Sequence, residues 1–79
     1  MKAREILKEL LADKLERYGI GESELNDRFD LVRSGLLNSL EFVEVISMLE
    51  KRLEREIDYE HAISREDFTT IKGVIRNFE

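Results

Sequence analysis

The stretch Gly35–Phe42, which reads GLLNSLEF, marks the point where a loop becomes an amphipathic helix. Asn38 is a favourable N-cap, because its side-chain oxygen can accept a hydrogen bond from a free backbone N–H in the first helical turn. Glu41, further along that turn, can accept a bond from the Asn38 N–H, which completes a capping box. Ser39 then takes the first helical position without a structural duty for its hydroxyl. We therefore expect a free hydroxyl beside the unpaired N–H groups of a helix N-terminus, where a phosphate is stabilised.

This stretch resembles the attachment motif of the acyl carrier protein superfamily, in which Gly, two hydrophobic residues, Asp, Ser and Leu follow one another. The likeness includes Asp30 and Leu31 before the motif, and in length, helix order and acidity it covers nearly the whole chain. In that family the serine carries a 4′-phosphopantetheine arm. The resemblance therefore implies this cofactor on Ser39, with Asn38 and Leu40 beside it. Asn38 stands where the family usually has Asp, so one negative charge beside Ser39 is missing. This difference affects which phosphopantetheinyl transferase recognises the chain.

The composition is typical of a folded, highly soluble helical protein. Of the 79 residues, 42% are hydrophobic and 39% are charged, and there is no proline. We expect an all-α fold with a single domain over residues 1–79, because so short a chain holds one core. The absence of cysteine excludes disulfides and thiolate metal sites and fits a reducing compartment. No apolar run could span a bilayer and the N-terminus lacks a secretory signal pattern, so we expect a cytoplasmic protein without membrane insertion.

The net charge of −5 comes from the middle of the chain. Residues 19–50 contain seven acidic and only two basic side chains, whereas residues 1–18 and 51–79 are nearly balanced. Such a field repels nucleic acid and attracts basic protein surfaces. We therefore expect partner enzymes with basic docking surfaces and no nucleic acid. The alternative is a solvated acidic surface that only keeps the chain soluble.

Hydrophobic spacing predicts three longer helices and one short third helix. The expected ranges are 3–18, 39–53, 64–68 and 70–78. In the first helix the apolar stripe runs from Leu7 to Tyr18, and Gly19 is expected to end it. Thr70 is expected to cap the last helix. With a long first loop over residues 19–37, the resemblance implies a four-helix bundle of the acyl-carrier type.

The helix over residues 39–53 has two distinct faces. Its inward face is centred on Phe42, Ile46, Leu49 and Leu53 and flanked by Val43 and Val45. Its outward face includes the expected partner-binding residues Leu40, Glu41, Glu44 and Met48. Adaptable apolar contacts among carboxylates favour an interface with a basic partner, and the resemblance implies the same. The alternative is that Leu40 and Met48 contact the long loop or are simply exposed.

The resemblance also implies a pocket that shelters the attached chain. The candidate lining consists of Val43, Ile46, Ile63, Phe68 and Ile71. We expect no metal site, because the acids between Glu22 and Asp30 lack the order of an EF-hand. His61, the only histidine, is expected on the surface.

Two functions remain open. The first is a monomeric acyl carrier protein that holds acyl or aminoacyl intermediates as thioesters on the arm and presents them to enzymes of fatty-acid, polyketide or nonribosomal-peptide-type biosynthesis. Such a protein is not an enzyme and has no catalytic residues. The second is a small acidic helical interaction module without a prosthetic group, in which Asn38 and Ser39 only begin a helix. A hydrolase is disfavoured, because no base or nucleophile-elbow pattern accompanies Ser39.

Overall fold

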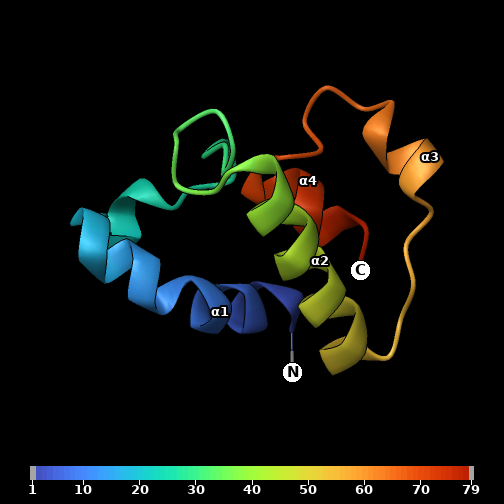
Figure 1. The fold of residues 1–79 in the computed structure, drawn as a ribbon, viewed down its shortest axis with the longest axis horizontal. Helices are drawn as coiled ribbons and strands as arrows, with labels where there is room; N and C mark the ends of the chain where they lie inside the picture. The colour runs from blue at the N-terminus through green and yellow to red at the C-terminus, as the bar shows by residue number, and fades with distance from the viewer. Residues whose placement is uncertain (1, 79) are drawn as a thin grey trace.

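The computed structural model describes residues 2–78 and contains four α-helices of unequal length (Figure 1). They are α1 (Ala3–Tyr18), α2 (Ser39–Leu53), α3 (Tyr59–Ile63) and α4 (Ile71–Arg76), with a short 3-10 turn, η1 (Glu22–Glu24), after α1. The described residues contain no β-strand, and a single isolated bridge joins Asp30 and Thr70. The chain is therefore all-α, as predicted.

Helix α1 begins and ends where the sequence predicts. It consists mainly of strong helix formers, and its buried side chains are Ala3, Ile6, Leu7 and Leu11. Gly19 ends it in the left-handed conformation, with φ of 67°. Tyr18 does not continue the buried stripe, because its side chain is 57% exposed. The C-terminal end of α1, where Tyr18 is the last residue, extends away from α2 and α4 (Figure 1).

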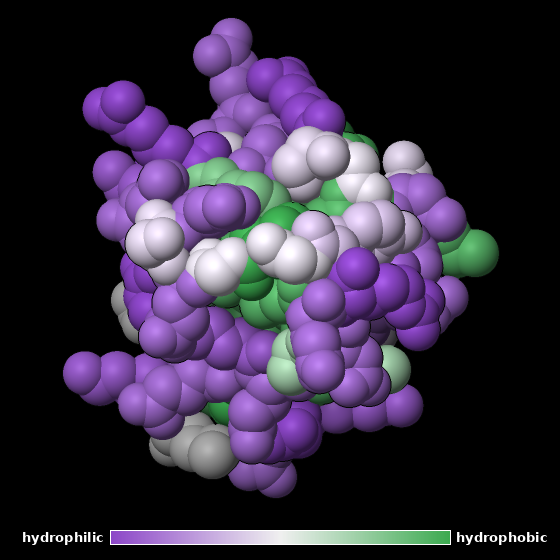
Figure 2. All heavy atoms as spheres, turned by 90° about the vertical axis from the view of Figure 1, so that its left-hand side faces the viewer, coloured by the Kyte–Doolittle hydropathy of each residue, from purple (hydrophilic) through white to green (hydrophobic). Residues whose placement is uncertain are grey.

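The core lies where α1 packs against α2 and α4. The long first loop contributes its own leucines to it, which are Leu25, Leu31, Leu36 and Leu37. These side chains explain how so long a connection is kept in a small domain. Viewed from the side on which α1 ends, hydrophilic side chains surround a hydrophobic centre (Figure 2). Within residues 2–78, no helix combines the length and apolarity needed to cross a bilayer.

The short third helix lies earlier than predicted. It spans Tyr59–Ile63 instead of 64–68, because Asp58 accepts a hydrogen bond from the His61 N–H at 3.2 Å and caps it there. Ser64, which was expected to begin the helix, closes it instead: its hydroxyl donates to the His61 carbonyl at 2.6 Å. Only Ala62 of α3 is buried, so this helix lies at the edge of the molecule (Figure 1).

The last helix begins as predicted but is shorter than the predicted range 70–78. Thr70 Oγ1 accepts from the Gly73 N–H at 3.0 Å, which confirms the cap. The helix stops at Arg76, because the Asn77 side chain donates to the Gly73 carbonyl at 2.9 Å and competes for a helical acceptor. The fold therefore has two long helices, not three. Gly73 permits close packing, since a Cβ there would lie 1.8 Å from the Asp67 carbonyl oxygen.

Candidate functional site

The start of α2 has the predicted capping box. Asn38 is extended, with φ of −83° and ψ of 175°, and its Oδ1 accepts from the Glu41 N–H at 2.8 Å. Glu41 Oε1 accepts from the Asn38 N–H at 2.9 Å. Phe42 then begins the regular helical bonding by donating to the Asn38 carbonyl at 2.9 Å. The cap is therefore complete without Ser39.

Ser39 is the first residue of α2 and is exposed. Its hydroxyl takes part in neither bond of the capping box. The backbone N–H groups of Ser39 and Leu40 have no hydrogen-bond partner among the described residues. An accessible hydroxyl thus lies beside free donors at the positive end of a helix of 15 residues. A phosphodiester attached to Ser39 Oγ would meet these donors, so the residues present fit a phosphopantetheine arm.

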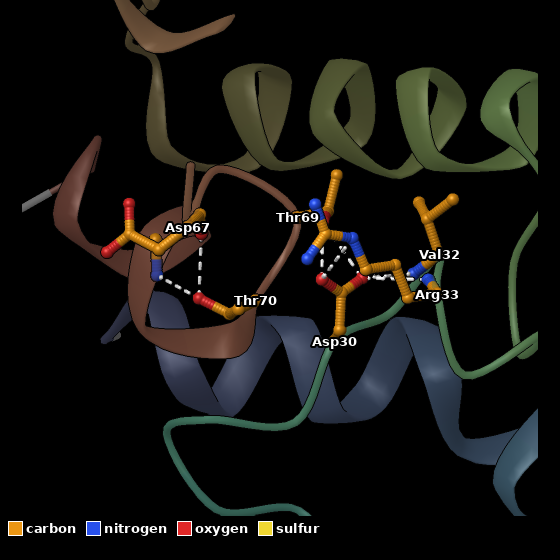
Figure 3. A network of polar contacts seen from close by, with 7 residues as sticks. Asp30, Val32, Arg33, Asp67, Thr69 and Thr70 are labelled. Carbon is orange, nitrogen blue, oxygen red and sulfur yellow. Dashed lines mark hydrogen bonds and ion pairs between the residues drawn. The ribbon is translucent and has the colours of Figure 1, made fainter. Parts of the chain in front are cut away.

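A network of polar contacts, which we call the loop clasp, holds the turn that precedes this helix (Figure 3). Asp30 Oδ1 accepts from the N–H groups of Val32 and Arg33 at 3.0 and 2.8 Å. Thr69 Oγ1 donates to the same carboxylate at 2.8 Å. The Leu31 N–H donates to the Thr69 carbonyl at 2.8 Å. The loop clasp therefore joins the first loop to the segment that leads into α4.

The loop clasp continues to the start of α2. The Leu37 N–H donates to the Leu31 carbonyl at 2.9 Å, and Gly35 makes the turn between them with φ of 87°. Such a φ strongly favours glycine over residues with a Cβ. Because Leu37 directly precedes Asn38, these contacts fix the direction in which the chain enters α2.

The electrostatics of Asp30 follow from its surroundings. Partial burial would by itself raise the pKa of this carboxyl group. Hydrogen bonds from the Arg33 N–H, the Thr69 hydroxyl and the Val32 N–H outweigh burial and hold the pKa of Asp30 below its ordinary value of 3.8. Asp30 is therefore ionised at neutral pH, which suits an acceptor of several donors.

Three of the four predicted partner-binding residues are exposed on one side of α2. Leu40 is 69% exposed and Met48 is 46% exposed, and Glu44 is exposed as well. Glu41 differs, because its carboxylate accepts from Lys14 Nζ of α1 at 2.6 Å. The Lys14 ammonium group, with the Asn38 N–H, lowers the pKa of Glu41. Glu41 therefore joins α1 to α2, a contact that the sequence reasoning missed.

The five residues predicted to line an acyl pocket are distributed over different environments. Ile46 and Ile71 are 0% and 4% exposed and belong to the core. Phe68 is half-buried and packs edge-on against Phe42, with ring centroids 5.2 Å apart. Val43 and Ile63 are 45% and 65% exposed, so Val43 lies outside the inward face predicted for α2.

Two of these residues, Ile63 and Phe68, line one cavity together. It is an open cleft of about 440 Å³ between the first loop and the segment that joins α3 to α4. The cleft also contains Arg33 and Arg65, which the sequence reasoning did not single out.

Neither a metal site nor a role for His61 emerges from the structure. Across residues 2–78, no three His, Cys, Asp or Glu side chains are grouped so that they could hold a metal ion. His61 is exposed, as expected.

Comparisons of the chain with protein-family models, with curated proteins and with solved structures found no match.

Proposed function

We propose that this chain is an acyl carrier protein whose 4′-phosphopantetheine arm is attached to Ser39. The observation that carries the proposal is the exposed Ser39 at the first position of α2, beside a cap that Asn38 and Glu41 complete without it. The match between the Gly35–Leu40 motif and the attachment motif of carrier proteins supports the same assignment. The acyl-carrier arrangement of the four helices is part of this proposal.

Attachment requires an accessible oxygen nucleophile. The Ser39 oxygen would attack the phosphorus of coenzyme A that bears the pantetheine, and the bond from that phosphorus to the oxygen of the adenosine bisphosphate would break. A base on the phosphopantetheinyl transferase would take the hydroxyl proton. Once attached, the arm supplies a terminal thiol that holds acyl or aminoacyl groups as thioesters. The chain contributes attachment and recognition and catalyses no step.

The exposed side of α2 supplies a surface for partner enzymes. Leu40 and Met48 offer apolar contacts, and Glu44 adds a negative charge between them. Partners with basic docking surfaces would be attracted by the net charge of −5. These partners include the transferase and the enzymes that load or receive acyl or aminoacyl groups in lipid, polyketide or peptide-type biosynthesis. A monomer in the cytoplasm fits such a role.

The experiment is intact-mass measurement after incubation of the purified chain with coenzyme A and a phosphopantetheinyl transferase. We expect a gain of one phosphopantetheine group in the natural chain and in Ser23→Ala, a matched variant of an exposed serine in η1. We expect no gain in Ser39→Ala. An unmodified mass with several transferases would contradict the proposal and favour the interaction module without an arm.

A further inference from the structure

Helices α1 and α2 pack against each other (Figure 1), and two open clefts adjoin along their junction. The clefts have volumes of about 280 and 220 Å³ and share Leu10 and Met48 in their lining. Leu10 packs against the core and is partly buried, whereas Met48 is 46% exposed. We call the surface formed by Leu10, Glu44, Met48 and Lys51 the Met48 face. A flexible, exposed methionine at its centre is typical of surfaces that adapt to a partner.

The charges of the Met48 face change sign along α2. Glu44 precedes Met48 by four residues and Lys51 follows it by three, so both lie about one turn away on the same side of the helix. Both are exposed, and neither forms an ion pair in the described part of the chain. Arg52, the next basic residue, is already paired with Glu9 of α1 at 3.0 Å. Glu44 and Lys51 are therefore the charges that remain for a partner.

This order of charges is its own complement. Two copies related by a twofold axis present the same surface to each other in opposite directions. With the axis at Met48, Glu44 of each copy would face Lys51 of the other, and the two methionines would meet between these contacts. A partner with only basic charges would instead bring a like charge to Lys51. A second copy therefore fits the whole Met48 face, whereas a uniformly basic surface fits only its Glu44 half.

We propose that two copies of this chain associate through the Met48 face, with their α2 helices antiparallel. Ser39 precedes Met48 by nine residues, which is about two and a half helical turns, so it lies on the opposite side of α2. The pairing thus neither requires nor blocks an arm on Ser39, and its test is independent of the proposed function. Because the dimer covers Glu44 and Met48, the monomer is the form in which the chain would meet partner enzymes.

The experiment is sedimentation equilibrium of the intact chain at concentrations up to about 1 mM, where even a weak dimer is populated. Salt at about 0.15 M limits the Debye length to about 8 Å, which screens the long-range repulsion between two copies of net charge −5. We expect a dimer of the natural chain. Glu44→Lys and Lys51→Glu, each alone, should raise the dissociation constant at least about tenfold, because each brings like charges together at two symmetry-related contacts.

The two swapped variants should rescue each other. In an equimolar mixture of Glu44→Lys and Lys51→Glu, each contact between the two variants again joins opposite charges, so we expect dimerisation to return. The double variant Glu44→Lys/Lys51→Glu should likewise dimerise with itself. Matched controls are Glu16→Lys and Arg28→Glu, which change the net charge equally at exposed positions outside both clefts. These controls should leave the dissociation constant nearly unchanged, and far-UV circular dichroism verifies that every variant is folded.

Three results would overturn the proposal. A natural chain that remains monomeric up to about 1 mM would leave the Met48 face to a different protein. A dimer that both swapped variants retain, or that neither their mixture nor the double variant restores, would show that Glu44 and Lys51 do not meet across a twofold axis. Equal weakening by the control variants would show that only the net charge matters.

Discussion

Helices α2 and α3 both begin with an N-cap, but they are held in place very differently. Helix α2 has a reciprocal capping box and buries the side chains Phe42, Val45, Ile46 and Leu49. Helix α3 has a single cap bond, which the Asp58 side chain accepts from the His61 N–H, and it buries only Ala62. The residue proposed to carry the arm is thus on the firmly packed helix, and the open cleft that Ile63 and Phe68 line is bordered by the lightly packed one. Attachment would need a fixed position, whereas a helix with a single buried residue, such as α3, is expected to open locally more often.

The largest expected difference between the two helices concerns a single isoleucine in each. Ile46→Ala removes a side chain that is 0% exposed, and we expect it to lower the free energy of unfolding by about 2–5 kcal/mol. Ile63→Ala removes one that is 65% exposed, and we expect a change within about 0.5 kcal/mol. Urea denaturation measures both. Similar losses in the two variants would contradict the contrast between α2 and α3.

The loop clasp should contribute nearly as much to the free energy of unfolding as a core side chain does. The Asp30 side chain is 16% exposed and accepts bonds from Val32, Arg33 and Thr69. Asp30→Asn removes the charge that strengthens these bonds, and we expect it to cost about 1–3 kcal/mol of unfolding free energy. Asp13→Asn, at an exposed position of α1, is the control and should cost little. A neutral Asp30→Asn would mean that the turn before α2 does not depend on this carboxylate.

The same carboxylate should make stability depend on pH. The pKa of folded Asp30 lies below its ordinary value of 3.8. Ionised Asp30 therefore stabilises the folded chain above the pKa of the unfolded state, and this contribution is lost as the pH falls through the folded pKa. Between about pH 7 and about pH 3, Asp30→Asn should lose less stability than the natural chain. If the urea midpoint fell equally in the natural chain and in Asp30→Asn over this pH range, this role of Asp30 would be refuted.

The contributions of the α2 and α3 N-caps to global stability should differ by a smaller amount. Asn38→Ala removes the acceptor of the Glu41 N–H, and we expect a loss of about 1 kcal/mol in global stability. Asp58→Ala removes the cap of α3, and we expect its effect to be confined to faster amide hydrogen exchange in that helix. A global loss in Asp58→Ala as large as that in Asn38→Ala would show that α3 is part of the cooperative core.

The smallest expected effect is that of the ion pair between α1 and α2. Lys14→Gln removes a partly exposed partner of Glu41, so we expect a loss of about 0.2–1 kcal/mol, reduced by added salt. Lys51→Gln, at an exposed position of α2, is the control. A loss that does not respond to salt would argue against an electrostatic origin.

The parts of the fold that local chemistry determines could be predicted from the sequence. The bounds of α1 and α2 follow from helical periodicity, Gly19 and the Asn38 cap, all of which are local in the sequence. The position of α3 could not be predicted, because Asp58 and Ser64 both resemble a cap and only the folded chain selects between them. The length of α4 depended on a side-chain bond of Asn77 that periodicity does not report.

The candidate site also contains some features that could be predicted from the sequence and others that could not. The free hydroxyl of Ser39 was predictable, since its neighbours complete the cap. The pair of Lys14 with Glu41 joins residues on different helices, and the cleft that contains Arg33 and Arg65 is lined by residues of two loops. No local pattern indicates such pairs, because they depend on how the chain returns on itself.

The most direct test of the proposed attachment is fragmentation mass spectrometry of the peptide that trypsin releases after incubation with coenzyme A and a transferase. This peptide, Ser34–Lys51, contains the serines Ser34, Ser39 and Ser47. The proposal predicts one phosphopantetheine group, located on Ser39. An unmodified peptide, or a group located on Ser34 or Ser47, would contradict it.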